Sequence, residues 1–298
     1  MNEQQGVYWH QGMFLQPQHF QQSDRNKQHQ LGVMRKAGQP HLWGVGELVL
    51  NKTAINNRLI EVESARLIFP DATCVEAPAN ALISPRSFDA SLLTGDKPFK
   101  IYLGLRKLNS QQPNVTLIDD TTAAGTVNTR FITLSNPPEV ADIYSSGPMA
   151  PVLCLIHVLR IFFENETETL DDYDLIPIAC LERDGDTIRL SETFIAPSYS
   201  LAASPTLFSI IKEIRDELAG RARQLQEFKS PREMQKAEFD ANYMVFLMAL
   251  RSLNRTAPYL YHLTESPDSH PWYAYGALRQ LIGELSSFSE RFNMIGET

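Results

Sequence analysis

The stretch from Gly6 to Arg25, GVYWHQGMFLQPQHFQQSDR, places large apolar side chains close to the N-terminus, where most chains fray. Apolar groups in such a position stay ordered only if they pack on another element. Because Pro17 restricts the residue before it to extended or turn geometry, we expect residues 7–15 to run extended and a helix to start within residues 18–30. The segment packs either in the chain's own core or in a partner or trimer interface. The side chains concerned are Trp9, Met13, Phe14 and Phe20.

The composition is that of a folded protein without a strongly basic surface. The chain has 298 residues, of which 43% are hydrophobic and 21% charged, and its size suggests two domains. With 27 basic and 35 acidic residues the net charge is −8, which argues against binding to nucleic acid or to an anionic bilayer. The longest apolar runs, Val152–Val158 and Met244–Leu250, are far shorter than the roughly 18 residues of a membrane span. No signal peptide is recognisable, so we expect a cytosolic protein with no direct membrane insertion.

The sequence has no pattern typical of an enzyme. A Gly-rich phosphate loop, HExxH, GxSxG and the kinase motifs are absent, so we predict neither catalysis nor a cofactor. Asp171, Asp172 and Asp174 lack the oxygen spacing of a calcium loop and are interpreted as part of a solvated turn. Four histidines lack ligand spacing and three cysteines are interpreted as small buried residues, so no metal is predicted. These residues are His10, His19, His29 and His41, and Cys74, Cys154 and Cys180.

Residues 26–197 are predicted to form a β domain. Runs rich in Val, Ile, Leu and aromatic residues are separated by Pro, Gly, Asn or Asp, which is typical of an antiparallel β-sandwich. Apolar side chains alternate from Ile101 onward in Phe99–Arg106, so one face of that strand should be buried. Arg183–Asp186 has the sequence of a hairpin turn. The expected strands are Leu42–Leu50, Leu59–Phe69, Phe99–Arg106, Thr129–Leu134, Val152–Glu164 and Asp174–Leu181.

From Ser204 onward the sequence predicts a bundle of helices joined by short loops. Ser204 is a suitable N-cap before Pro205 and should start the first helix, and the pair Ser230–Pro231 repeats this signal for a second helix. Pro258 should kink or end the second helix, and a third helix should follow Pro271. The apolar stripes fit packing within one chain and packing between copies, and both alternatives stay open. The first helix presents Leu207, Ile211, Ile214, Leu218, Leu225 and Phe228. The others present Met234, Ala237, Ala241, Met244, Val245, Met248 and Leu253, and Tyr275, Leu278, Ile282, Leu285, Phe288 and Phe292.

The N-terminal stretch contains Trp9 and Gly12–Leu15, followed by Pro17–Gln22 and Asp24–Arg25. Together with three later motifs it resembles the TssK family, a baseplate subunit of the bacterial type VI secretion system. The resemblance follows the family's order over nearly all 298 residues. Gln11 and Gln16 differ from the acidic and the basic residue that are common in the family. The later motifs are Pro40–Val45, Phe69–Thr73 and Ser200–Pro205.

The resemblance implies an α+β fold with a β-sandwich shoulder, similar to that of phage receptor-binding proteins, and a helical-bundle neck. The domains would be a docking segment at 1–25, a shoulder at 26–197 and a neck at 198–298. The implied function is that of a non-enzymatic, homotrimeric baseplate adaptor, which binds the TssF–TssG wedge at the cytoplasmic face of the inner membrane. The family's head domain, which contacts TssJ, TssL and TssM of the membrane complex, is expected to be missing here.

The expected interface residues combine the N-terminal stretch with the stripe of the first neck helix. An alternative function is that of a phage tail receptor-binding or lectin-like carbohydrate-binding module. Such a module would expose Trp and Tyr side chains for stacking on sugar rings. The chain has three Trp, and Trp9 and Trp43 belong to the motifs that resemble TssK.

Overall fold

The computed structural model describes residues 2–93, 98–185, 187–229 and 241–297 of the chain. They divide into two compact units, Met1–Pro197 and Ser198–Thr298. The first unit contains all the strands and the second consists of helices and connecting turns, so the predicted α+β class is confirmed. Each unit is described separately below.

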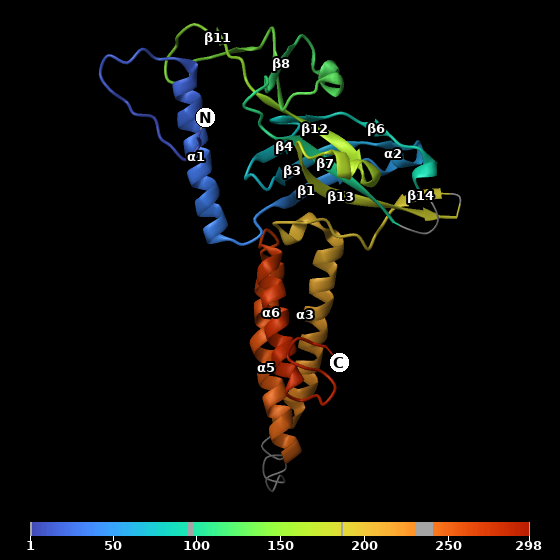
Figure 1. Ribbon diagram of the computed structural model, residues 1–298. Coiled ribbons are helices and arrows are strands. Elements are labelled where there is room, and N and C mark those ends of the chain that lie inside the picture. The colour runs from blue at the N-terminus through green and yellow to red at the C-terminus, as the bar shows by residue number, and fades with distance from the viewer. Residues whose placement is uncertain (1, 94–97, 186, 230–240, 298) are drawn as a thin grey trace. The chain divides into compact units, whose positions relative to one another are not determined.

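The first unit is built on a seven-stranded sheet with the order β14-β13-β7-β12-β9-β8, in which β5 also pairs with β12 (Figure 1). A three-stranded sheet, β1-β3-β4, contacts it where β1 meets β13 and β4 meets β5. Two ribbons, β2-β6 and β10-β11, complete the unit. The strands are β1 Gly44–Leu50, β2 Leu59–Ile60, β3 Val62–Ile68, β4 Cys74–Ala77, β5 Ala81–Ile83, β6 Arg86–Ser87, β7 Phe99–Arg106, β8 Val115–Ile118, β9 Phe131–Leu134, β10 Glu139–Val140, β11 Ala150–Pro151, β12 Ile156–Phe163, β13 Tyr173–Asp184 and β14 Thr187–Leu190.

Strand β7 is the centre of the first unit's core. Its alternating residues Ile101, Leu103 and Leu105 are completely buried, as the period-two pattern predicts. On the other face, a Cβ atom added at Gly104 would lie 2.6 Å from the ring of Phe162 on the neighbouring strand β12. The glycine therefore allows the aromatic ring to cross directly over the backbone of β7.

Several details of the β domain differ from the sequence prediction. The pairs β8-β9 and β5-β12 are parallel, and β8 was not among the expected strands. Strand β12 begins at Ile156, and the residues before it, Val152–Leu155, are exposed because no neighbouring strand pairs with them in the described structure. Cys74 and Cys154 are also exposed, which contradicts their prediction as buried residues; only Cys180 is buried. The predicted hairpin is confirmed as β13-β14, with Arg183 opposite Ile188.

Helix α1, Pro17–Gly38, begins one residue before the run 18–30 in which its start was expected. Pro17 occupies its first turn, and the helix continues without interruption past residue 25, so the expected division at residues 25 and 26 falls inside it. The preceding residues 7–15 do not form a strand, because they turn at Gly12, which adopts φ +79°. A second, short helix, α2, spans Lys52–Asn56, and short 3-10 turns connect the strands. These turns are η1 Ala90–Leu92, η2 Thr121–Thr126 and η3 Glu164–Thr169.

The second unit is a bundle in which α5 packs against both α3 and α6 (Figure 1). The predicted start of α3 is confirmed, since the Ser204 side chain accepts a hydrogen bond from the Leu207 amide at 3.2 Å. The backbone amide of Leu201 donates to the Ser269 carbonyl at 2.9 Å and ties the start of α3 to the turn before α6. The elements are η4 Leu201–Ala203, α3 Pro205–Gln226, η5 Glu227–Lys229, α5 Ala241–Glu265 and α6 Pro271–Ser286.

One prediction about the bundle was wrong, one is narrowed and one cannot be compared. Pro258 does not end the second helix: it lies inside α5, which runs on to Glu265, because the buried side chains on both sides of the proline outweigh its cost of roughly 3 kcal/mol. Helix α6 ends at Ser286, so Phe288 and Phe292 lie beyond it. The expected start at Ser230–Pro231 lies outside the described residues. Among the described residues, no helix combines the length and apolar character of a membrane span.

Candidate partner-binding surfaces

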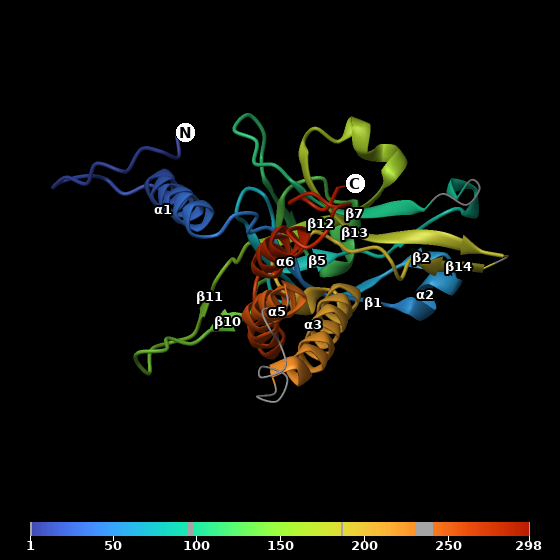
Figure 2. The same cartoon turned by 90° about the horizontal axis from the view of Figure 1, so that it is seen from below.

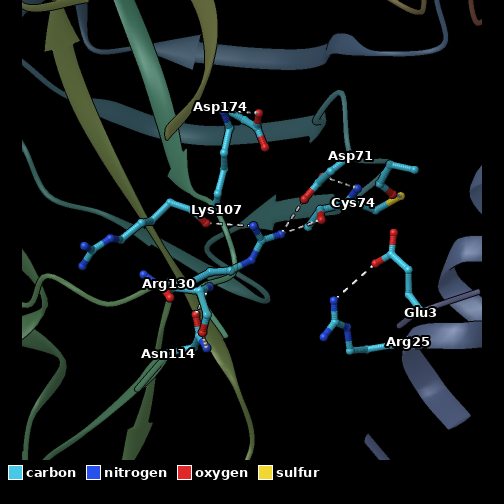
Figure 3. Close-up of polar contacts among 12 residues, drawn as sticks. Glu3, Arg25, Asp71, Cys74, Lys107, Asn114, Arg130 and Asp174 are labelled. Atoms are coloured by element: carbon cyan, nitrogen blue, oxygen red, sulfur yellow. Dashed lines mark hydrogen bonds and ion pairs between the residues drawn. The ribbon is translucent and has the colours of Figure 1, made fainter. Parts of the chain in front are cut away.

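Residues 2–38 form an N-terminal hairpin in which the first segment folds back along α1. The side-chain amide of Gln22 donates to the carbonyl oxygens of Asn2 and Gln5, both at 2.6 Å. Arg25 and Glu3 form an ion pair at 3.3 Å (Figure 3). Polar contacts with α1, rather than apolar burial, therefore hold the beginning of the chain in place.

The aromatic side chains of this hairpin face solvent. Trp9 is 51% exposed, Phe14 82% and Phe20 53%, while Met13 is half-buried. The rings of Trp9 and Phe20 lie 6.3 Å apart and form a small cluster at the start of α1. Such large exposed apolar groups are typical of a surface that a partner covers. Leu15, Leu31 and Met34 extend the exposed apolar surface of the hairpin.

The C-terminal end of α1 is attached to the turn between β3 and β4. Arg35 donates to the Ala72 carbonyl oxygen at 3.3 Å and to the Cys74 sulfur at 3.2 Å. Ala72 adopts φ +70°, a left-handed conformation that is uncommon for a residue with a side chain. A cavity of about 240 Å³, the α1 pocket, lies at this junction. It is lined by Gly32, Arg35, Lys36, Gln39, His41, Leu42, Trp43, Pro70 and Ala72.

A buried arginine fixes this turn from the side of the main sheet (Figure 3). The Arg130 side chain is 3% exposed and donates to the Arg106 carbonyl at 2.8 Å, to the Asp71 carboxylate at 2.9 Å and to the Thr73 hydroxyl at 2.7 Å. Burial alone would raise the pKa of Asp71, but the Arg130 charge and hydrogen bonds from Thr73 lower it overall. Asp71 is therefore ionised and paired at neutral pH. From the sequence, Asp71 was named only as part of the motif Phe69–Thr73, and Arg130 was not singled out.

His157 on β12 lies beside this network and should make stability depend on pH. Its ring is 4.8 Å from that of Phe131, and burial together with the Arg130 charge lowers its pKa from 6.5 to about 4. An unfolded chain takes up this proton near pH 6.5, whereas the folded chain resists until about pH 4. Stability should therefore fall by about 3 kcal/mol as the pH is lowered between these values. Urea unfolding at pH 7, 6 and 5 measures this slope, and His157→Phe should flatten it. An unchanged slope in the variant would contradict the assignment to His157.

The expected neck interface on α3 is covered by the chain itself. Ile211 and Leu218 are buried, and Leu207, Ile214 and Leu225 pack against the same cluster. The side chain of Phe228 lies outside the described structure. Of the two alternatives for this stripe, the structure thus supports packing within one chain. The cluster comprises Leu201, Ile211, Leu218, Ala222, Leu250, Leu253, Ala257, Leu260, Leu263, Ala274 and Leu281.

The outer surface of α5 and α6 carries an exposed aromatic groove, the α5-α6 groove. Tyr259 is 40% exposed, Trp272 40% and Tyr273 44%, and they line a cavity of about 420 Å³. Arg255 and Glu284, which form an ion pair at 2.8 Å, also line this cavity. Several residues of the predicted apolar stripes lie on the exposed surface, because leucines and alanines at other helical positions fill the core. They are Met244, Val245, Met248, Tyr275 and Ile282.

The acidic side chains near Asp171 form ion pairs, and no group of three or more His, Cys, Asp or Glu residues in the described ranges is placed to hold a metal ion. Asp172 pairs with Arg106 at 3.2 Å, and Asp174 lies 4.0 Å from Lys107. The exposed apolar side chains of the N-terminal hairpin and of the α5-α6 groove are suited to binding macromolecular partners.

Comparison with known proteins agrees with this description. Residues 19–296 match the family model T6SS_VasE, described as "Bacterial Type VI secretion, VC_A0110, EvfL, ImpJ, VasE". The chain is 28% identical to the type VI secretion system baseplate component TssK1 of Pseudomonas aeruginosa over 289 residues, which is 95% of this chain and 61% of that protein.

Solved structures of TssK share the fold. One from a TssK-TssF-TssG baseplate subcomplex superimposes with a TM-score of 0.81 at 23% identity and covers 97% of this chain and 90% of that one. A crystal structure of TssK gives a TM-score of 0.80 at 23% identity, over 96% of this chain and 62% of that one. The match of the family model to most of the sequence shows that the chain belongs to the T6SS_VasE family of bacterial type VI secretion proteins.

Proposed function

We propose that this chain is a non-enzymatic adaptor of the type VI secretion baseplate, located in the cytoplasm at the inner face of the inner membrane. The match of the family model to residues 19–296 is the observation that carries the proposal. The exposed apolar surfaces of the N-terminal hairpin and of the α5-α6 groove support it, because an adaptor works by burying such surfaces against its partners.

We propose further that the chain forms a homotrimer and that α5 and α6, rather than α3, supply the neck contact. The stripe of α3 is covered within one chain, whereas Trp272, Tyr275 and Ile282 are 40%, 54% and 42% exposed. Light scattering at micromolar concentration should give three times 33.7 kDa. Tyr275→Ala should weaken the trimer by about 1 to 2 kcal/mol, while Arg221→Ala on α3 serves as the exposed control. A monomer under these conditions would exclude the trimer.

The wedge-binding surface is proposed to include the aromatic cluster of the N-terminal hairpin. Replacing Trp9 or Phe14 with alanine should weaken capture of TssF and TssG by about 2 to 4 kcal/mol if these side chains are buried in the complex. Because Phe14 is 82% exposed in the chain, its replacement should leave the unfolding free energy nearly unchanged. Leu117→Ala, at an exposed position on β8, is the matched control. If Trp9→Ala and Phe14→Ala both capture TssF and TssG as well as the unchanged chain does, the aromatic cluster serves only local packing.

Contact with TssJ, TssL and TssM is proposed to require the head domain that the TssK resemblance implies. The experiment that measures capture of TssF and TssG can also include the cytosolic parts of TssL and TssM. We expect this chain to retain TssF and TssG without retaining TssL or TssM. Their retention would assign the membrane-side contact to the residues described here.

The carbohydrate-binding alternative is favoured by one feature, the α5-α6 groove with Tyr259, Trp272 and Tyr273 in its lining. Aromatic faces of this kind also stack on sugar rings. A glycan array distinguishes the two functions. Binding that Trp272→Ala abolishes would support the lectin-like alternative, and the absence of binding would support the adaptor.

A further inference from the structure

The β10-β11 ribbon carries an exposed tip, residues 141–149, which we call the arm tip. Figure 2 shows the ribbon projecting away from the sheets of the first unit. Ile143 is 82% exposed and Tyr144 is 93% exposed. The Asp142 carboxylate accepts hydrogen bonds from the Tyr144 amide at 2.8 Å and from the Ser145 hydroxyl at 2.7 Å. The tip therefore presents an aromatic side chain on a turn that is already ordered, which lowers the entropic cost of binding.

The α1 pocket has the size and charge to receive such a side chain. Its volume of about 240 Å³ exceeds the roughly 150 Å³ of an engineered protein cavity that takes up benzene. Leu42, Trp43 and Pro70 provide apolar surface, and the side chains of Arg35 and Lys36 add positive charge. No carboxylate is among the residues that line it. The pocket is thus suited to an aromatic side chain that is accompanied by acidic residues.

The chain itself contains a segment that combines an aromatic side chain with acidic residues. From Asn136 to Leu155 it has two acidic residues, Glu139 and Asp142, and no Lys or Arg. Helix α1 has the opposite balance, with four basic residues against one acidic residue. The helix therefore carries net positive charge within a chain whose net charge is −8. This complementarity favours a second copy of the chain as the occupant of the pocket.

We propose that the arm tip of one copy inserts Tyr144 into the α1 pocket of a neighbouring copy, with Asp142 facing Arg35 and Lys36. Within one chain, Tyr144 is 93% exposed and does not occupy its own pocket. Arm and pocket are different surfaces, so each copy gives one contact and receives another, as in a closed ring. The inference rests on the proposed homotrimer and adds a specific contact to it.

Site-directed disulfide formation tests this contact. In chains in which the exposed Cys74 and Cys154 are replaced by serine, one copy carries Tyr144→Cys and a second, differently tagged copy carries Lys36→Cys. Mild oxidation of the co-expressed pair should link the two tags. Each variant alone should give no linked product, nor should a pair in which Thr187→Cys, at an exposed position of β14, replaces Lys36→Cys.

Light scattering on the same samples separates this inference from the proposed trimer. Tyr144→Ala should raise the concentration at which the trimer dissociates by about 10- to 100-fold. If trimers form but the disulfide does not, and Tyr144→Ala leaves the trimers intact, the inference about the arm tip is overturned. The proposed trimer itself would still be supported. The inference would also be overturned if Tyr144→Ala left the trimer intact but reduced capture of TssF and TssG, since the arm would then bind the wedge.

Discussion

Arg130→Ala is expected to destabilise the first unit by about 3 to 5 kcal/mol. The substitution removes the three hydrogen bonds that the 3%-exposed guanidinium donates and leaves Asp71 without its charged partner. The turn that carries Asp71 and Thr73 also receives Arg35 of α1 through the Ala72 carbonyl, so the attachment of α1 should loosen as well. Urea unfolding at pH 7 measures the loss, and protease sensitivity of residues 2–38 measures the loosening.

Arg66→Ala is the matched control for this prediction. Arg66 also pairs with a carboxylate, Glu47 at 3.6 Å, but its side chain is 48% exposed, so its loss should change stability by about 0.5 kcal/mol or less. Asp71→Asn should fall between the two variants, because the amide can still accept a hydrogen bond from Arg130. Equal effects of Arg130→Ala and Arg66→Ala would show that the buried network does not hold the turn.

Leu260→Ala is expected to destabilise the second unit by about 2 to 5 kcal/mol. Leu260 is completely buried in the cluster shared by α3, α5 and α6, and its truncation leaves a cavity among well-packed side chains. Met248→Ala on the same helix should change the stability of the free chain by about 0.5 kcal/mol, because Met248 is 55% exposed. Thermal unfolding compares the two variants. A larger loss for Met248→Ala would mean that the buried face of α5 is misassigned.

The parts of the fold that follow from local chemistry were predictable from the sequence. Strand β7 has the predicted bounds, Phe99–Arg106, because its alternation of side chains fits only a strand with one buried face. The β13-β14 hairpin and the Ser204 cap of α3 depend on turn and capping residues that act within a few positions. These features need no knowledge of what packs against them.

The parts that depend on distant packing were not predictable in this way. Apolar residues cover more than one face of α5 and α6, and only the fold decides that Leu250 and Leu260 are buried while Met244 and Met248 are exposed. The parallel pair β8-β9 depends on tertiary placement of a short strand with weak alternation. Pro258 illustrates the same rule, since tertiary packing in α5 overrides a strong local signal.

The sequence singled out the aromatic residues near the N-terminus but not the buried Arg130. The aromatic residues near the N-terminus drew attention because such side chains are unusual at a chain end, and the structure places them on an exposed surface. Arg130 gave no comparable signal, because a single buried arginine has the same sequence context as an exposed one. The arm tip could have been suspected from Ile143 and Tyr144 within a stretch rich in Pro, Ser and Gly.

Size-exclusion chromatography with light scattering, performed on a mixture with purified TssF and TssG, tests the proposed adaptor function most directly. We expect the chain alone to elute with three times its mass of 33.7 kDa. The mixture should give one larger species containing all three proteins, which Phe14→Ala diminishes and Leu117→Ala does not. A chain that elutes separately from TssF and TssG at every micromolar concentration tried would contradict the proposed function.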